Sequence, residues 1–140
     1  LEKMTYNEIR EFRYAVEFQA VVLAMDNITK DQIEKLQKNL DILENSQDEE
    51  EQVLNDKMIH YTIVEASGNR LVIANYLALA KIMDNFIRET RSKIMTDERN
   101  SIAFQGIHRR LVEAICSRDL ELGKKALDEH FVYICKNLDT

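Results

Sequence analysis

The segment VLNDKMIHYTIVEASGN (residues 53–69) decides the fold of this chain. Asp56, His60 and Ile63 recur at the three- and four-residue spacing that places side chains on one face of an α-helix. The pair Gly68-Asn69 ends the pattern, since glycine readily takes the left-handed conformation that closes many helices. A helix that carries an acid and a histidine one turn apart on a largely apolar face predicts a helical domain with a polar core site.

The composition agrees with a single helical domain. The chain has 140 residues, 45% hydrophobic and 31% charged, with no proline and only three glycines. This length supports one core, and the absence of proline removes the main helix breaker. We therefore expect an all-α fold, an antiparallel bundle of about six helices in a single domain covering residues 1–140.

Helix limits can be predicted from the apolar period and the capping residues. Helices are expected over residues 6–25, from 29 to the mid-forties, 46–67, 70–95, from about 100 to 116, and from 119 onward. Thr29 with Gln32, and Ser46 with Glu49, have capping-box spacing, and Asp119 is an expected N-cap. The run from Leu71 to Met83 is apolar almost all round, which predicts the central helix of the bundle.

Charge and hydropathy limit the partners of the chain. The net charge of −6 disfavours binding to phosphate backbones, so this chain is not expected to bind nucleic acid by itself. No apolar stretch approaches the ~20 residues of a membrane span, and no signal peptide is present, which predicts a cytoplasmic protein without a membrane partner. The first residue is Leu1 and not Met, which suggests a fragment of a longer protein.

All three histidines of the chain are expected to face the core. His108 shares a helical stripe with Leu111, and His130 lies on the apolar face of the last helix. Together with His60 and Asp56 they converge from three helices. A divalent cation would satisfy these four buried groups at once, and imidazole with carboxylate suits Zn best, with Ni, Co or Mn possible.

A simpler interpretation remains open, in which each histidine is a core residue with its own hydrogen bond. Spacing alone does not decide between the shared metal site and this alternative. The Glu-x-x-His pattern of di-iron carboxylate proteins and the His-Glu-x-x-His pattern of zinc proteases are both absent.

A series of short motifs then runs through the chain in order. They are Glu11-Phe12-Arg13 with Glu17, Asp56-Lys57-Met58-Ile59-His60, Glu65-Ala66-Ser67-Gly68-Asn69, His108 with Ala114, Ile115 and Asp119, and Ala126 with His130. With these spacings the chain resembles, over nearly its whole length, the FCD domain, the C-terminal ligand-binding domain of GntR-type regulators of the FadR subfamily. Ile59 stands where that family usually has Phe, and Gly123 where it usually has Ala; both look like packing changes.

The resemblance implies a metal-dependent sensor. Members of the metal-binding type hold the ion through residues that match Asp56, His60, His108 and His130, and the open positions take water or the carboxylate of a small organic acid. It also implies a homodimer with a winged helix-turn-helix DNA-binding domain upstream, absent from this chain. The expectation of six helices is closer to the VanR-like branch than to the fatty-acid branch.

We therefore predict an effector-sensing domain and not an enzyme. Arg13 is the best further candidate to hold the effector, because arginine suits a carboxylate. An equally probable alternative is a surface ion pair between Arg13 and Glu17. The rival function is a metal-dependent hydrolase, for which Glu65 and Glu129 are candidate general bases by position only.

Overall fold

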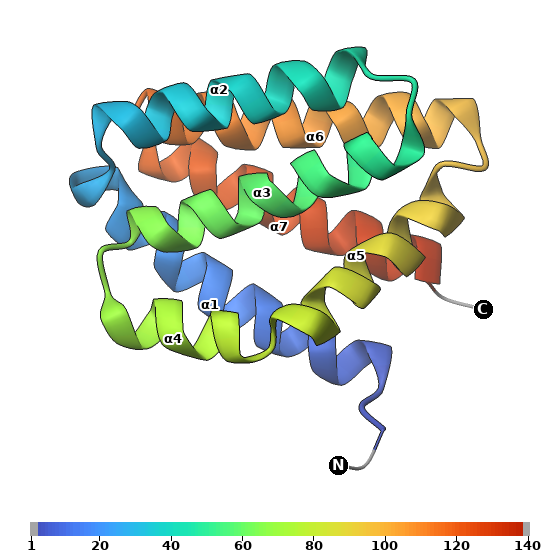
Figure 1. Cartoon of the computed structure of the whole chain (residues 1–140), viewed down its shortest axis with the longest axis horizontal. Coiled ribbons are helices and arrows are strands. Elements are labelled where there is room, and N and C mark those ends of the chain that lie inside the picture. The colour runs from blue at the N-terminus through green and yellow to red at the C-terminus, as the bar shows by residue number, and fades with distance from the viewer. Residues whose placement is uncertain (1–2, 139–140) are drawn as a thin grey trace.

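The computed structural model describes residues 3–138 as a bundle of seven α-helices (Figure 1). They are α1 (Tyr6–Asn27), α2 (Lys30–Asn45), α3 (Glu49–Ala66), α4 (Arg70–Ala78), α5 (Ala80–Ile94), α6 (Glu98–Cys116) and α7 (Leu120–Leu138). No strand occurs in this range, so the all-α prediction is confirmed. None of the described helices has the length and apolarity needed to cross a membrane.

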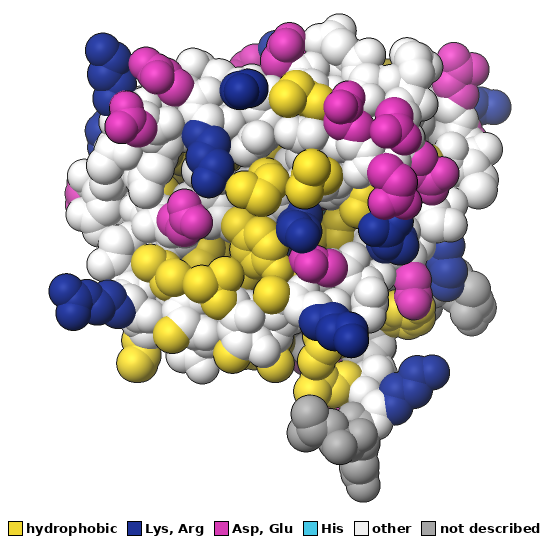
Figure 2. Space-filling model, in the orientation of Figure 1, with side chains coloured by type: hydrophobic (Ala, Val, Ile, Leu, Met, Phe, Trp, Pro, Cys, Tyr) yellow, Lys and Arg dark blue, Asp and Glu magenta, His cyan; other side chains and the backbone are white. Residues whose placement is uncertain are grey.

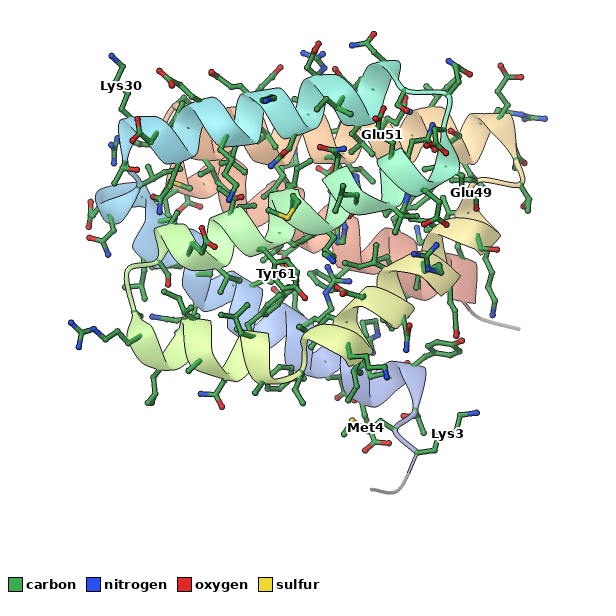
Figure 3. All side chains as sticks on the ribbon, viewed as in Figure 1. Lys3, Met4, Lys30, Glu49, Glu51 and Tyr61 are labelled. Carbon is green, nitrogen blue, oxygen red and sulfur yellow. The ribbon has the colours of Figure 1, made fainter. Side chains whose placement is uncertain are left out.

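Local capping chemistry explains most helix limits. The Thr29 hydroxyl accepts a hydrogen bond from the Gln32 amide at 3.2 Å, and the Gln32 side chain accepts one from the Thr29 amide at 3.0 Å. Asp119 caps α7 through the Leu122 amide at 3.1 Å. Asp48, and not Ser46, caps α3. Glu49 and Glu51 extend from its first turn (Figure 3), where the helix dipole favours negative charge.

The helices pack in an arrangement that encloses one core. Helix α2 lies antiparallel to α3 and also contacts α6, while α6 packs along α7 (Figure 1). Helix α1 contacts α3 and α7, and α5 closes the bundle against α7 and α3. Helices α3, α6 and α7 therefore each turn one face toward a shared interior, and α1 and α5 cover that interior from the side.

The prediction of one central helix over residues 70–95 is wrong in two respects. It is divided at Leu79, whose φ of −108° and ψ of 19° interrupt the helix between α4 and α5. It is also not central, because Leu71 is 68% exposed and Leu77 is 52% exposed. Hydrophobic side chains accordingly gather on the face of the molecule over α3 and α4 (Figure 2). Tyr76 is the one fully buried residue of α4.

The sequence departure at Gly123 has a packing reason. A Cβ at Gly123 would lie 2.7 Å from the Met25 Cε atom and 3.2 Å from the Val21 Cγ1 atom. An alanine at this position would therefore require the end of the Met25 side chain to move, where α7 approaches α1. Ile59, the other departure, is fully buried. Both fit the expectation of altered packing.

Candidate metal centre

The structure brings the three histidines together from three helices. His60 comes from α3, His108 from α6 and His130 from α7, and one ring nitrogen of each lies within 4.8 Å of the others. All three are buried, with at most 1% of the residue surface exposed. This cluster can hold a metal ion, and it matches the sequence expectation that the histidines face one core.

Two of the histidines have one ring nitrogen fixed by the protein. The His60 Nδ1–H group donates to the Glu17 carboxylate. The His108 Nδ1–H group donates to the Phe104 carbonyl oxygen at 2.9 Å. These bonds set the tautomer that leaves each Nε2 atom with a free lone pair, an arrangement common to histidines that bind metals.

The remaining ring nitrogens explain why the cluster fits a cation. His60 Nε2, His108 Nε2 and His130 Nδ1 are buried and have no hydrogen-bond partner among the described residues. An unpaired buried polar atom carries a substantial desolvation cost, and three in one place are unusual for a histidine core. The alternative of three separately satisfied core histidines is therefore disfavoured by this geometry.

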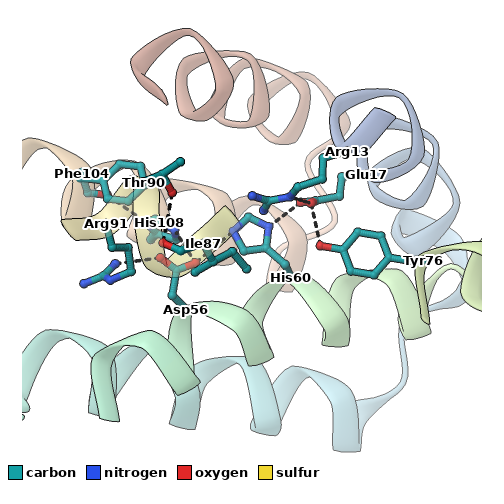
Figure 4. Close-up of polar contacts among 10 residues, drawn as sticks. All are labelled: Arg13, Glu17, Asp56, His60, Tyr76, Ile87, Thr90, Arg91, Phe104 and His108. Carbon is teal, nitrogen blue, oxygen red and sulfur yellow. Dashed lines mark hydrogen bonds and ion pairs between the residues drawn. The ribbon is translucent and has the colours of Figure 1, made fainter. Parts of the chain in front are cut away.

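Asp56 lies beside the cluster and is also held by a partner that was not among the expected site residues. Its Oδ1 atom is 3.3 Å from the Nε2 atoms of both His60 and His108. Its Oδ2 atom accepts a hydrogen bond from Arg91 Nη1 at 2.7 Å (Figure 4). One carboxylate oxygen thus faces the histidines while the other is bound to α5.

Arg91 could have been found from the sequence. Ile87, Arg91 and Ile94 follow the helical spacing of one buried stripe, and all three are buried in the structure. A guanidinium in such a stripe requires a buried anion. The inward carboxylate of Asp56 therefore implied a buried cation, and Arg91 is that cation.

Arg13 is buried beside the cluster, whereas the alternative interpretation placed it in an ion pair at the surface. Its Nε atom donates to Glu17 Oε2 at 2.9 Å, so the ion pair of the alternative exists but lies in the core. The guanidinium carbon lies 5.4 Å from the Phe86 ring centre and 5.2 Å from that of Phe131. Tyr76 donates its hydroxyl hydrogen to the same Glu17 oxygen at 2.9 Å (Figure 4).

The ionisation states follow from these contacts. Burial opposes ionisation of Glu17, but Arg13 and His60 outweigh it and lower the pKa of Glu17 to about 2. Burial likewise opposes ionisation of Asp56, yet His108 and Arg91 hold its pKa well below the usual value. Burial, followed by the charges of His60 and His108, lowers the pKa of His130 well below that of an ordinary histidine. His130 is therefore neutral and able to ligate.

The two candidate general bases of the hydrolase alternative lie at the surface. Glu65 is exposed and has Lys35 at 3.8 Å, and Glu129 is bound to Arg110 at 2.9 Å. Neither contacts the histidine cluster in the described structure. The geometry therefore provides no base from these two residues for a water at the site.

Comparisons with known proteins agree with the fold and the motifs. Residues 8–132 match the family described as the FCD domain. Among solved structures, the chain is similar to the metal-free FCD domain of TM0439, a proposed transcriptional regulator, with 25% identity and a TM-score of 0.70 over 98% of both chains. No curated protein matches. The VanR-like branch was favoured because six helices were expected. Seven helices are observed in the described residues, so that reason no longer holds.

Proposed function

Since the chain belongs to the FCD domain family, a family of regulatory domains and not of enzymes, we propose that it is the metal-dependent effector sensor of a GntR-type transcription regulator. The observation that carries this proposal is the set of three buried imidazole nitrogens that have no hydrogen-bond partner within residues 3–138. His60, His108 and His130 would hold the ion, and Asp56 would supply its Oδ1 atom as the fourth ligand. These borderline ligands suit Zn, Ni, Co or Mn better than Ca or Mg.

The charge balance of the site supports an anionic effector. Glu17 and Asp56 contribute two negative charges, and Arg13 and Arg91 contribute two positive charges, all in the core. When the three imidazoles are unprotonated, as metal ligands must be, this set has no net charge. A bound divalent ion would supply two uncompensated positive charges and open coordination positions. A small carboxylate or hydroxy-carboxylate that reaches the interior would compensate this charge.

Two guanidinium groups are available to orient such an acid. Arg13 Nη2 and Arg91 Nη2 are buried and have no hydrogen-bond partner among the described residues. Arginine presents parallel N–H groups that match a carboxylate, so either atom can complete its hydrogen bonding on the effector. Arg13 remains the proposed effector residue, and the structure adds Arg91 as a second candidate.

The proposed regulator acts through parts that lie outside this chain. We expect a homodimer in which each subunit has an upstream winged helix-turn-helix, and the effector shifts the population between two arrangements of these modules. The acidic chain of residues 1–140 is not expected to bind DNA at physiological salt. Sequence-specific DNA binding by this chain alone would contradict the domain assignment.

A thermal-shift screen of small organic acids tests the proposal. The protein is compared after loading with Zn²⁺ and after verified removal of metal by chelation. Zn²⁺ should raise the melting temperature, and an effector acid should raise it further only in the loaded protein, because a ligand stabilises the state it binds. An unchanged melting temperature with Zn²⁺, or an equal acid effect without metal, would overturn the proposal.

Arg13→Lys separates effector binding from structural support. Lysine keeps a positive charge beside Glu17 but removes the forked N–H groups. The variant should keep the Zn²⁺-dependent shift and lose most of the acid-dependent shift. Arg109→Lys is the matched control, because Arg109 lies at the surface in pairs with Glu44 and Glu113. Equal acid responses in the two variants would exclude Arg13 as an effector residue.

A further inference from the structure

Helix α4 lies at the surface, but one side chain links it directly to the candidate metal centre. Tyr76 is fully buried, and its hydroxyl donates to Glu17 Oε2 at 2.9 Å. The other oxygen of Glu17 accepts the Nδ1–H group of His60. Tyr76, Glu17 and His60 thus form a chain of hydrogen bonds from α4 across α1 to the cluster (Figure 4).

From this chain we propose that Tyr76 is a positioning residue that couples occupation of the metal site to the packing of α4. This inference rests on the proposed function. The coupling acts through Glu17, because a bond that fixes one ring nitrogen of a metal-binding histidine orients the ring and tunes its basicity. The hydroxyl of Tyr76 fixes the orientation of that carboxylate in turn.

A shared acceptor makes Tyr76 sensitive to the effector as well. Arg13 Nε and the Tyr76 hydroxyl both donate to the same oxygen, Glu17 Oε2. An acid that draws the Arg13 guanidinium toward itself weakens one of the two bonds to this oxygen. The remaining partner, Tyr76, then takes a larger share of the negative charge of Glu17. Both the ion and the acid therefore act on α4 through one carboxylate.

Helix α4 is suited to respond because Tyr76 is its one fully buried residue. It has nine residues, from Arg70 to Ala78, and it packs against α1 and α3. It begins after its N-cap Asn69, whose side chain accepts from the Leu71 and Val72 amides, and it ends at Leu79, where α5 starts without a side-chain cap. Segments with few buried side chains open with low free energy, so a change in one buried hydrogen bond alters the opening of such a helix.

Amide hydrogen exchange of the whole chain, with Zn²⁺ and with a chelator, tests the coupling. In the wild type, Zn²⁺ should slow exchange in α4 by about ten-fold, as expected for strengthening one hydrogen bond to a carboxylate. In Tyr76→Phe the slowing in α4 should disappear, while the slowing in α6 and α7 around His108 and His130 should persist. A Tyr76→Phe variant that keeps the α4 response would overturn the inference.

Tyr61→Phe is the matched control. The Tyr61 ring packs edge-on against Tyr76 with ring centres 5.2 Å apart, but its hydroxyl donates to Asp84 and not to Glu17. This variant removes a neighbouring hydroxyl without touching the chain of hydrogen bonds, so the α4 response should remain. Loss of the response in both tyrosine variants would indicate a packing effect and overturn the inference.

A spectroscopic measurement separates positioning from simple support. Co²⁺ bound at the cluster should show a changed visible absorption spectrum in Tyr76→Phe, and its affinity should fall by about ten-fold, within the range for groups that orient a metal ligand. An identical Co²⁺ spectrum and affinity would overturn the positioning role. If the wild type slows in α6 and α7 but not in α4, the inference fails while the proposed function stands. If the wild type takes up no metal, both fail.

Discussion

The ion pair between Asp56 and Arg91 should dominate the stability of the metal-free domain. Both residues are at most 3% exposed, and the Arg91 Nη1 to Asp56 Oδ2 distance is 2.7 Å. Asp56→Asn leaves the guanidinium buried without its anion, which costs about 3–5 kcal/mol. In a chain of 140 residues, a loss of that size lowers the melting temperature by roughly 10–15 °C.

The double variant Asp56→Asn/Arg91→Met shows whether the pair itself is responsible. Removing both charges avoids the uncompensated guanidinium, so the double variant should be more stable than the sum of the single effects predicts, by at least about 2 kcal/mol. The assay is urea unfolding followed by circular dichroism, on protein freed of metal. If the single effects add within about 0.5 kcal/mol, Asp56 and Arg91 are not coupled and the reasoning is refuted.

Further predictions address the metal ligands, the pH dependence of stability and the packing at Gly123. His108→Ala and His130→Ala should each weaken Zn²⁺ binding in a chelator competition by ~100-fold or more, above the effect of groups that only orient a ligand; equal stability losses with and without metal would contradict this. Glu17→Gln should cost about 3 kcal/mol at neutral pH. Because the pKa of Glu17 is lowered from 4.5 to about 2, the stabilisation that its carboxylate provides is complete above pH 4.5 and is lost as the pH falls toward 2. The free energies of unfolding of the wild type and of Glu17→Gln should therefore become equal as the pH falls through this range. Gly123→Ala should destabilise the wild type but much less the Met25→Ala background, with a coupling of about 1 kcal/mol in unfolding experiments, since an added Cβ would lie 2.7 Å from the Met25 Cε atom.

Local signals were enough to predict most helix limits and the inward direction of the histidines. Capping at Thr29 and Asp119, and the break at Gly68, depend on side chains and backbone angles within a few residues, so the sequence contains them. The break at Leu79 has neither a glycine nor a side-chain cap. Nothing local marks it; it separates α4, which packs on α1 and α3, from α5, which packs mainly on α7 and α3.

The exposure of α4 and the role of Glu17 were missed because both depend on contacts between residues far apart in the sequence. Leu71 and Leu77 are apolar but exposed, and composition alone cannot distinguish a buried helix from one that presents apolar side chains to the surface. Glu17 was identified only as a partner of Arg13, since its contact with His60 spans 43 positions in the sequence. A helical pattern shows which side chains face the core, but not which of them meet there.

The depth of the histidine cluster has a kinetic consequence. His60, His108 and His130 are at most 1% exposed, so neither an ion nor an acid can reach them while the helices stay packed. Entry and escape must wait for a transient parting of the bundle. The observed rate of loading should then level off at high ligand concentration, at the opening rate of the protein. A domain built in this way would exchange a bound ion slowly, so the metal present during folding would stay bound long after its free concentration had changed.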